Sequence, residues 1–249
     1  MARKIRADQA LFEQGLVDNR EKAMRLIMAG QVLLERDGRL EPVAKPGQQV
    51  AIDDVLVLKE GERFVSRGGY KLLTAIENFG VDFTELVVLD AGASTGGFTD
   101  CALQHGARRV YAVDVGTNQL HEKLRADPRV VNLEGVNLRH AGSDLIPESV
   151  DAVVADVSFI SLTLVLPACM HFLKPSGIVV ALVKPQFELE PREVIKGVVR
   201  EEALQSKAVD KIIAFADQEL GLILSGVVPS RIKGPKGNQE YLACFRKPA

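Results

Sequence analysis

The sequence predicts two domains, a small α+β domain followed by a larger α/β domain with a doubly wound, mostly parallel sheet. The chain has 249 residues, more than one domain of ordinary size needs. Helix and strand patterns fill the first sixty residues, and from Leu86 onward short apolar runs alternate with helical segments. Hydrophobic residues make up 47% of the chain, which supplies a core and argues against disorder.

Two helices are predicted at the start of the chain. The first covers residues 7–15, where small and apolar side chains follow helical spacing. The second begins at Asp18 or Asn19, either of which can cap its first turn, and Gly30 closes it. Both helices belong to the small domain.

Short strands complete this domain. Residues 31–35 and 55–58 read as strands, and Asp37-Gly38 as a tight turn. Residues 41–49 contain two prolines and a glycine, and we expect a loop there. The order is therefore helices first and strands second.

Basic side chains gather around the two helices. Lys22 and Arg25 are three positions apart, so they share a helix face. The net charge of residues 1–40 is only +2, so charge alone leaves open a solvated helix face or a phosphate-binding surface. The candidates for RNA contact are Arg3, Lys4, Arg6, Arg20, Lys22 and Arg25.

The run R-E-K-A-M-R-L-I-M-A-G-Q-V at residues 20–32 resembles the S4 RNA-binding domain, and the resemblance covers residues 4–58. Ala7 departs from the family, which usually carries leucine there. The resemblance implies an S4-type RNA-binding domain over residues 1–59. The charged, glycine-containing residues 60–70 are predicted to form a linker.

The second domain has the alternating pattern of a doubly wound sheet. Its first five predicted strands are mostly apolar, as expected of strands covered on both faces. Helical segments at 99–104 and 204–219 lie between strands. The predicted strands are residues 87–89, 109–113, 130–133, 151–155, 178–183, 222–228 and 241–245.

A glycine-rich turn follows the first of these strands. Asp90 ends the strand, and Asp114 ends the next one, where a carboxylate suits a ribose diol. A dinucleotide site needs a glycine where this chain has Ser94, and acidic residues would repel a pyrophosphate. A cationic cofactor fits the acidic residues better. A turn without any ligand is the remaining alternative.

The spacing D-A-G-A-S-T-G at residues 90–96 resembles motif I of the class I methyltransferases. The resemblance implies a Rossmann-like fold with S-adenosylmethionine as the cofactor. The cofactor-binding residues it implies are Asp90, Gly92, Ala93, Ser94, Thr95, Gly96, Gly97, Phe98, Asp114, Val115, Asn137 and Asp156.

Four polar residues lie where apolar strands or helices begin or end: Lys71, Asp156, Lys184 and Glu240. The carboxyl ends of parallel strands meet at one sheet edge, which Glu240 also reaches if the last strand is antiparallel. Taken singly, Lys184 could only snorkel at a strand end and Asp156 could only cap a helix. Their combination favours a catalytic site.

The order Lys-Asp-Lys-Glu resembles the catalytic tetrad of the FtsJ-like ribose 2′-O-methyltransferases. Together with S-R-G-G-Y-K at 66–71, D-V-S-F-I-S at 156–161 and K-P-Q-F-E at 184–188, it makes the whole chain similar to the TlyA, or hemolysin A, family. Tyr70 stands where leucine is commoner. The resemblance implies an FtsJ-like domain over residues 71–249 that methylates ribose 2′-hydroxyls of RNA, with ribosomal RNA and cytidine as the usual target.

A basic stretch precedes and follows Glu240. Residues 229–247 carry a net charge of +4, and a phosphate backbone or plain solvent could face them. Arg67, Arg231, Lys233 and Lys236 are the RNA-contact candidates here. Residues 186–200 are predicted to be a mobile loop over the substrate. Aromatic residues are only 5%, so we expect recognition through RNA shape and backbone rather than base stacking.

Composition argues against other classes. The net charge of −2 gives no global positive field, and no apolar run is long enough to span a membrane. The start of the chain has no secretory signal, and the three cysteines and four histidines lack metal-ligand spacing. We therefore expect a cytoplasmic protein without metal or membrane partners. The competing functions are a hemolysin-type membrane-active protein and an RNA-binding protein with an inactive methyltransferase domain.

Overall fold

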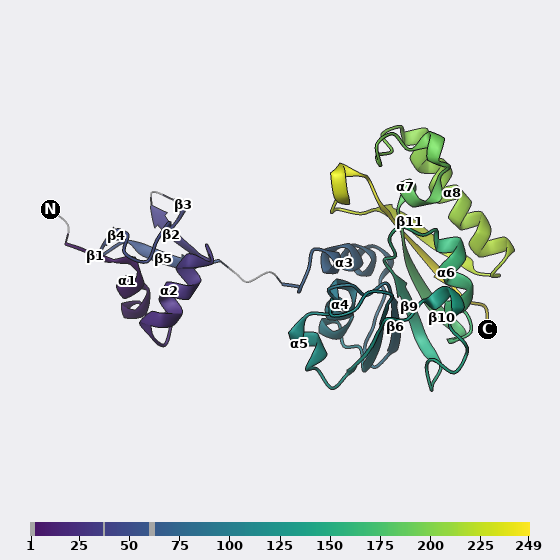
Figure 1. Ribbon diagram of the computed structural model, residues 1–249, viewed down its shortest axis with the longest axis horizontal. Helices are drawn as coiled ribbons and strands as arrows, with labels where there is room; N and C mark the ends of the chain where they lie inside the picture. The colour runs from purple at the N-terminus through teal and green to yellow at the C-terminus, as the bar shows by residue number, and fades with distance from the viewer. Residues whose placement is uncertain (1–2, 37, 60–62) are drawn as a thin grey trace. The chain divides into compact units, whose positions relative to one another are not determined.

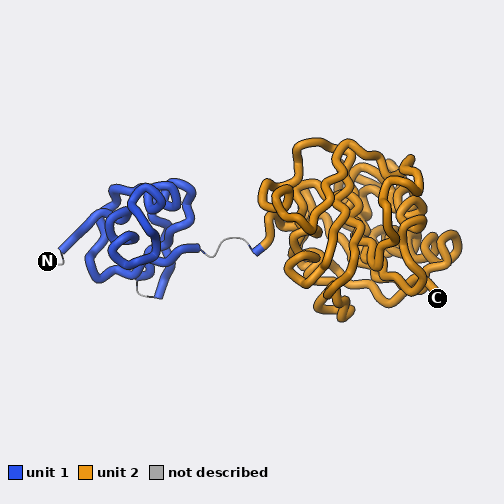
Figure 2. The backbone as a smooth tube through the Cα atoms, turned by 90° about the horizontal axis from the view of Figure 1, so that it is seen from below, with its two compact units in different colours: residues 1–63 blue, residues 64–249 orange. Residues whose placement is uncertain are grey.

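The computed structural model describes residues 3–36, 38–59 and 63–249. It divides into two compact units, residues 1–63 and residues 64–249 (Figure 2). Each unit has its own hydrophobic core, and the larger one has two core clusters.

The first unit packs two helices against short strands. The strands pair antiparallel, β1 with β4 and, in a second sheet, in the order β3-β2-β5. Fully buried side chains such as Leu11, Val32 and Val50 form the core between helices and strands. The elements are β1 (Lys4–Arg6), α1 (Ala7–Glu13), α2 (Arg20–Met28), β2 (Val32–Arg36), β3 (Arg39–Pro42), β4 (Gln49–Ala51) and β5 (Val55–Leu58).

The residues predicted to begin and end the second helix of this unit do so in the structure. The side chain of Asn19 accepts a hydrogen bond from the backbone N–H of Lys22 at 2.9 Å, which caps α2. Gly30 has φ +67° just after the helix. Asp37, half of the predicted turn, lies outside the described residues. Residues 41–42 were predicted as loop but pair in β3, an edge strand that tolerates Pro42.

The second unit is built on a seven-stranded sheet with the order β11-β12-β10-β9-β6-β7-β8. All pairs are parallel except those of β12, which runs antiparallel to both neighbours. The order reverses between β6 and β9, where the crevice of a doubly wound sheet opens. The strands are β6 (Val87–Ala91), β7 (Arg109–Asp114), β8 (Val130–Glu134), β9 (Val150–Ala155), β10 (Leu173–Val183), β11 (Ile223–Pro229) and β12 (Tyr241–Arg246).

Helices cover both faces of this sheet, as Figure 1 shows. On one face lie α3 (Gly68–Phe79), α4 (Gly97–Gln104) and α5 (Glu122–Arg125), and on the other α6 (Leu162–Cys169) and α8 (Glu202–Gln218). The shorter helices are α7 (Pro185–Glu188) and the 3-10 turns η1 (Leu138–His140), η2 (Pro191–Glu193) and η3 (Pro235–Gly237). Val87 and Leu89 of β6 pack toward α6, and Val88 packs toward α4, so the strand is buried on both sides.

The residues that join the units differ from the predicted linker. Residues 60–62 lie outside the description, but residues 64–70 pack in the second unit. Phe64 is 1% exposed, its ring lies edge-on to that of Tyr70, and a side chain on Gly69 would collide with it. The backbone N–H of Val65 donates to Asp100 at 2.8 Å. Residue 71, the predicted start of the methyltransferase domain, lies inside α3.

Residues 186–200 also have more structure than a loop. The segment contains η2, most of α7 and a backbone bridge between Ile195 and Val198. Glu188 is 5% exposed and Val199 3%, so the segment is packed onto the unit. Within the described ranges, no helix is both long and apolar enough to cross a membrane.

Candidate active site

Two adjoining cavities open at the carboxyl edge of the sheet, one of about 290 Å³ and one of about 540 Å³. Gly92, Ser94, Asp156 and Ser158 line both. The larger cavity lies within the size range of small-molecule sites, and the crevice at the strand-order reversal is where such sites form. We call them the first cavity and the second cavity.

The turn between β6 and α4 forms the border of both cavities, and its glycines are needed for close contacts. Gly92 has φ +86°, and a Cβ there would lie 2.9 Å from the carbonyl oxygen of Asp156. A Cβ on Gly97 would lie 2.4 Å from Ser66 Oγ, and one on Gly96 would meet Leu124. Since backbone and core leave no room, side chains are excluded from these positions.

Asp90 lies beneath this turn and lines neither cavity. It is fully buried, its Oδ2 accepts from the Thr99 hydroxyl at 2.6 Å, and its Oδ1 has no hydrogen-bond partner among the described residues. Burial raises the pKa of this carboxyl to about 7, and the charge of Asp156 adds to the rise. Asp90 therefore supports the turn from beneath rather than lining a cavity.

Asp114 lines the second cavity at the end of β7. Its two oxygens accept from the backbone N–H groups of Ser94, at 2.8 Å, and Gly116, at 2.7 Å. Each carboxylate oxygen can accept a second hydrogen bond. The carboxylate is thus fixed in place and still able to bind a pair of hydroxyls.

The rest of the second cavity combines an apolar wall with the side-chain amides of Gln119 and Asn137. Val115 is 72% exposed and lines the cavity, so it offers apolar surface to a ligand. The Oδ1 of Asn137 accepts from the backbone of Arg139 at 3.1 Å, which leaves the amide N–H groups for a ring nitrogen. The wall consists of Val113, Val115, Val136, Leu138, Val157, Ile160 and Val165.

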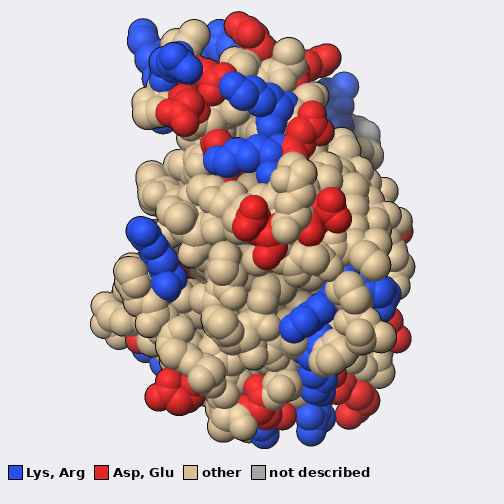
Figure 3. Space-filling model, turned by 90° about the vertical axis from the view of Figure 1, so that its right-hand side faces the viewer, with Lys and Arg blue, Asp and Glu red and all other residues tan. Residues whose placement is uncertain are grey.

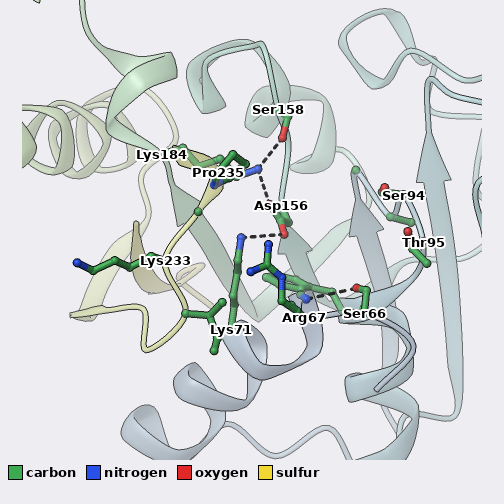
Figure 4. Close-up of a pocket in the computed structure, with 17 residues that line it drawn as sticks. Ser66, Arg67, Lys71, Ser94, Thr95, Asp156, Ser158, Lys184, Lys233 and Pro235 are labelled. Carbon is green, nitrogen blue, oxygen red and sulfur yellow. Dashed lines mark hydrogen bonds and ion pairs between the residues drawn. The ribbon is translucent and has the colours of Figure 1, made fainter. Parts of the chain in front are cut away.

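The four predicted catalytic residues come together in one ion-paired cluster (Figure 4). Lys184 Nζ lies 2.6 Å from Asp156 Oδ1. Lys71 Nζ lies 2.6 Å from Glu240 Oε2 and 3.8 Å from Asp156 Oδ2. Asp156 therefore stands between the two ammonium groups, beside the first cavity.

The sheet explains why these residues meet. Asp156 follows β9, Lys184 follows the neighbouring β10, and Glu240 precedes β12, whose antiparallel register sets Tyr241 opposite Val183. Lys71 reaches them from α3. Lys71, Lys184 and Glu240 are all under 9% exposed, and buried charges of this kind are stable only when paired.

Sequence reasoning missed one contact of the cluster. Lys184 Nζ also donates to Ser158 Oγ, at 2.7 Å. Ser158 stands two positions after Asp156, in the D-V-S-F-I-S run that carries the family resemblance, so its neighbourhood was visible in the sequence. Its contact with Lys184 could not be read from the sequence, because the two residues are 26 positions apart.

The predicted RNA contacts of the second unit divide into two groups. Arg67 and Lys233 line the first cavity. Arg231 instead pairs with Glu77 at 2.6 Å, and Lys236 Nζ donates to the carbonyl oxygen of Lys196 at 3.2 Å.

In the first unit, Asp8 forms ion pairs with two of the arginines that are predicted to contact RNA. Its fully buried carboxylate lies 2.8 Å from Arg6 and 3.3 Å from Arg20. Lys22 pairs with the exposed Asp18 at 2.9 Å. The predicted RNA residues Arg3, Lys4 and Arg25 are exposed.

Known proteins resemble the chain along its whole length. The profile of the FtsJ-like methyltransferase family matches residues 64–247. A Mycobacterium tuberculosis protein named 16S/23S rRNA (cytidine-2′-O)-methyltransferase TlyA is 45% identical over 249 residues, covering 99% of this chain and 91% of the relative. Hemolysin A of Brachyspira hyodysenteriae is 39% identical, covering 97% and 99%. A solved Streptococcus thermophilus structure, described as a hemolysin candidate, is 44% identical, covers 100% and 90%, and has a TM-score of 0.74.

Proposed function

This chain belongs to the FtsJ-like methyltransferase family and to its TlyA, or hemolysin A, group, and from that membership we propose that it methylates the ribose 2′-oxygen of RNA. The proposed methyl donor is S-adenosylmethionine. The proposed substrate is ribosomal RNA with cytidine as the target, which is the activity in the name of the Mycobacterium tuberculosis relative. Ribosomal subunits as substrate imply a cytoplasmic site of action.

The observation that carries this proposal is the ion-paired cluster of Lys71, Asp156, Lys184 and Glu240 beside the first cavity. Lys71 and Lys184 are buried and ion-paired with carboxylates, so they do not serve as ordinary solvent-exposed charges. The cluster lies beside the first cavity, which adjoins the second. An ammonium group held there would lie where a methyl donor and an acceptor oxygen could meet. This arrangement also disfavours an inactive domain.

The second cavity suits S-adenosylmethionine. Asp114 offers hydrogen-bond acceptors to the ribose diol, and the apolar wall with Asn137 offers a site for adenine. Asp156 adds negative charge near the cationic methionine end. When bound, the cofactor supplies a methyl group activated by the sulfonium.

The chain's own residues hold the acceptor. Lys184 donates to Ser158 and is ion-paired with Asp156, which holds its ammonium group beside the first cavity, where a substrate oxygen could bind it. Lys71 and Glu240 fix Asp156 from the other side. Because methyl transfer needs the 2′-oxygen in line with the methyl carbon, this ordering supplies much of the rate.

RNA is proposed to bind at local basic sites. Arg67 and Lys233 line the first cavity, and Arg6 and Arg20 lie together in the first unit, proposed as an S4-type RNA-binding domain. Figure 3 shows one face on which Lys and Arg lie next to Asp and Glu in mixed groups. A broad area without charged residues separates these groups. A face of this kind favours a few phosphate contacts over one broad positive field.

The decisive experiment is Lys184→Ala. We expect methyl transfer from labelled S-adenosylmethionine to ribosomal subunits to fall at least about 100-fold, because the acceptor loses its orienting ammonium group. Cofactor binding, measured by titration calorimetry, should stay within a few-fold of the unmodified protein. Ser206→Ala, on the exposed face of α8, is the control. Unchanged transfer by Lys184→Ala would refute the proposed role of Lys184, and no transfer by the unmodified protein would refute the proposed function.

A further inference from the structure

Ser158 holds the ammonium group of Lys184 from the side opposite the carboxylates. We propose that Ser158 is a positioning residue for methyl transfer, which fixes the direction in which Lys184 faces the acceptor oxygen. This inference rests on the proposed function and adds a residue outside the Lys-Asp-Lys-Glu set.

The contact and its place support this role. Ser158 Oγ accepts from Lys184 Nζ at 2.7 Å, close to the 2.6 Å between Nζ and Asp156 Oδ1. Ser158 lines both cavities, so the bond lies where donor and acceptor would meet. Figure 4 shows Ser158 and Asp156 on different sides of the Lys184 ammonium group.

The backbone next to Ser158 is strained. Phe159 has φ +64°, a left-handed conformation that is unfavourable for a bulky side chain. It is also 91% exposed, so burial of its own ring does not compensate for the strain. Neighbouring contacts hold this conformation, at the position directly after Ser158.

Those contacts come from the segment that follows Lys184. The ring of Phe187 lies 5.2 Å from that of Phe159. The buried carboxylate of Glu188 accepts from the Leu162 backbone N–H at 2.9 Å and from the Ser161 hydroxyl. The loop after β9 and the segment after β10 are thus joined at three successive places, of which the Ser158–Lys184 bond is the first.

Two acceptors restrict the orientation of the Lys184 ammonium group more than one acceptor can. With Asp156 alone, the ammonium group could rotate about that single ion pair, because a lysine side chain has several rotatable bonds. The hydrogen bond to Ser158 restricts this rotation, so the ammonium group keeps one orientation beside the first cavity. The expected loss without Ser158 is therefore in the rate of transfer rather than in binding.

The test compares Ser158→Ala, which has no hydroxyl, with Ser158→Thr, which keeps one. Loss of a hydrogen bond to a charged group predicts a kcat about 10- to 100-fold lower for the alanine variant. The KM for ribosomal subunits and the dissociation constant for S-adenosylmethionine should stay within about twofold, since no bond to either is removed. The threonine variant should recover most of kcat, and Ser206→Ala should match the unmodified protein.

The possible failures are distinguishable. If the unmodified protein transfers no methyl group to ribosomal subunits, the proposed function is wrong and this inference falls with it. If it does transfer, an alanine variant with an unchanged kcat refutes this inference alone. A loss carried by KM, or a threonine variant as slow as alanine at equal melting temperature, refutes it as well.

Discussion

At the scale of single residues, the buried carboxyl of Asp90 makes the stability of the fold depend on pH. It carries a pKa of about 7 because burial disfavours its charged form. The unfolded chain has an ordinary aspartate, so between about pH 4 and 7 the folded protein binds more protons than the unfolded one. Stability should therefore fall as the pH rises through this range.

Asp90→Asn tests this directly. Asparagine keeps an acceptor for Thr99 and cannot ionise, so the melting temperature of the variant should rise relative to the unmodified protein by roughly 5 °C or more between pH 4 and 8. Thermal unfolding followed by circular dichroism over this range measures the difference. A difference that does not change with pH would contradict the raised pKa.

Asp8 is the corresponding residue of the first unit, with the opposite shift. The Arg6 guanidinium lowers the pKa of this carboxyl, so Asp8 stays charged at neutral pH and holds Arg6 and Arg20 together. Since the folded pKa is depressed, the stabilisation is complete above pH 3.8 and is lost as the pH falls through the folded value.

Asp8→Asn should weaken binding to ribosomal subunits by about 10-fold, because the two arginines lose their common anchor. Filter binding at several salt concentrations measures this. Asp18→Asn, which removes only the exposed pair with Lys22, is the matched control and should change little. Equal affinities of Asp8→Asn and the unmodified protein would show that Asp8 does not prepare an RNA-binding surface.

At the scale of elements, the sequence predicted the strands of the sheet well because buried parallel strands are continuous apolar runs. It placed β10 from residue 178, whereas the strand begins at Leu173, since Pro175, Ser176 and Gly177 interrupt the apolar pattern. The register shifts between Leu173 and Ile178, which shows that the strand accommodates them as an irregularity. Periodicity alone does not reveal such an irregularity.

Segments whose glycines allow close packing were harder to predict from the sequence. Residues 66–69 belong to the stretch predicted as a linker, yet Gly68 and Gly69 pack closely against Gly97 and Phe64. The cluster of Lys71, Asp156, Lys184 and Glu240 followed from strand ends and the family resemblance. The contact of Ser158 with Lys184 did not, because it joins residues 26 positions apart.

Gly97→Ala tests the packing of these two turns. The added methyl would lie 2.4 Å from Ser66 Oγ and 2.8 Å from the backbone nitrogen of Gly69, so one of the turns must move. Because the turn between β6 and α4 borders both cavities, its displacement should lower the affinity for S-adenosylmethionine about 10-fold or more, as measured by calorimetry. Wild-type affinity in this variant would mean that the turns separate freely.

At the scale of the whole molecule, the ion-paired cluster and the proposed RNA contacts differ in charge. The cluster contains two lysines and two carboxylates, so it carries no net charge, whereas the proposed RNA contacts are cationic. Raising the salt concentration from 50 to 200 mM should therefore increase the KM for ribosomal subunits about 10-fold or more and leave kcat within about twofold. Steady-state kinetics at saturating cofactor checks this. A parallel fall in kcat would show that the cluster is open to ions.

The position of β12 has a further consequence for synthesis on the ribosome. This strand is made after the other six but inserts between β10 and β11, and β11 has no other partner in the sheet. Until residues 240–246 are available, the sheet therefore has an open gap beside β10, and Lys71 lacks Glu240, its partner at 2.6 Å. The ion-paired cluster is complete only after β12 has been inserted.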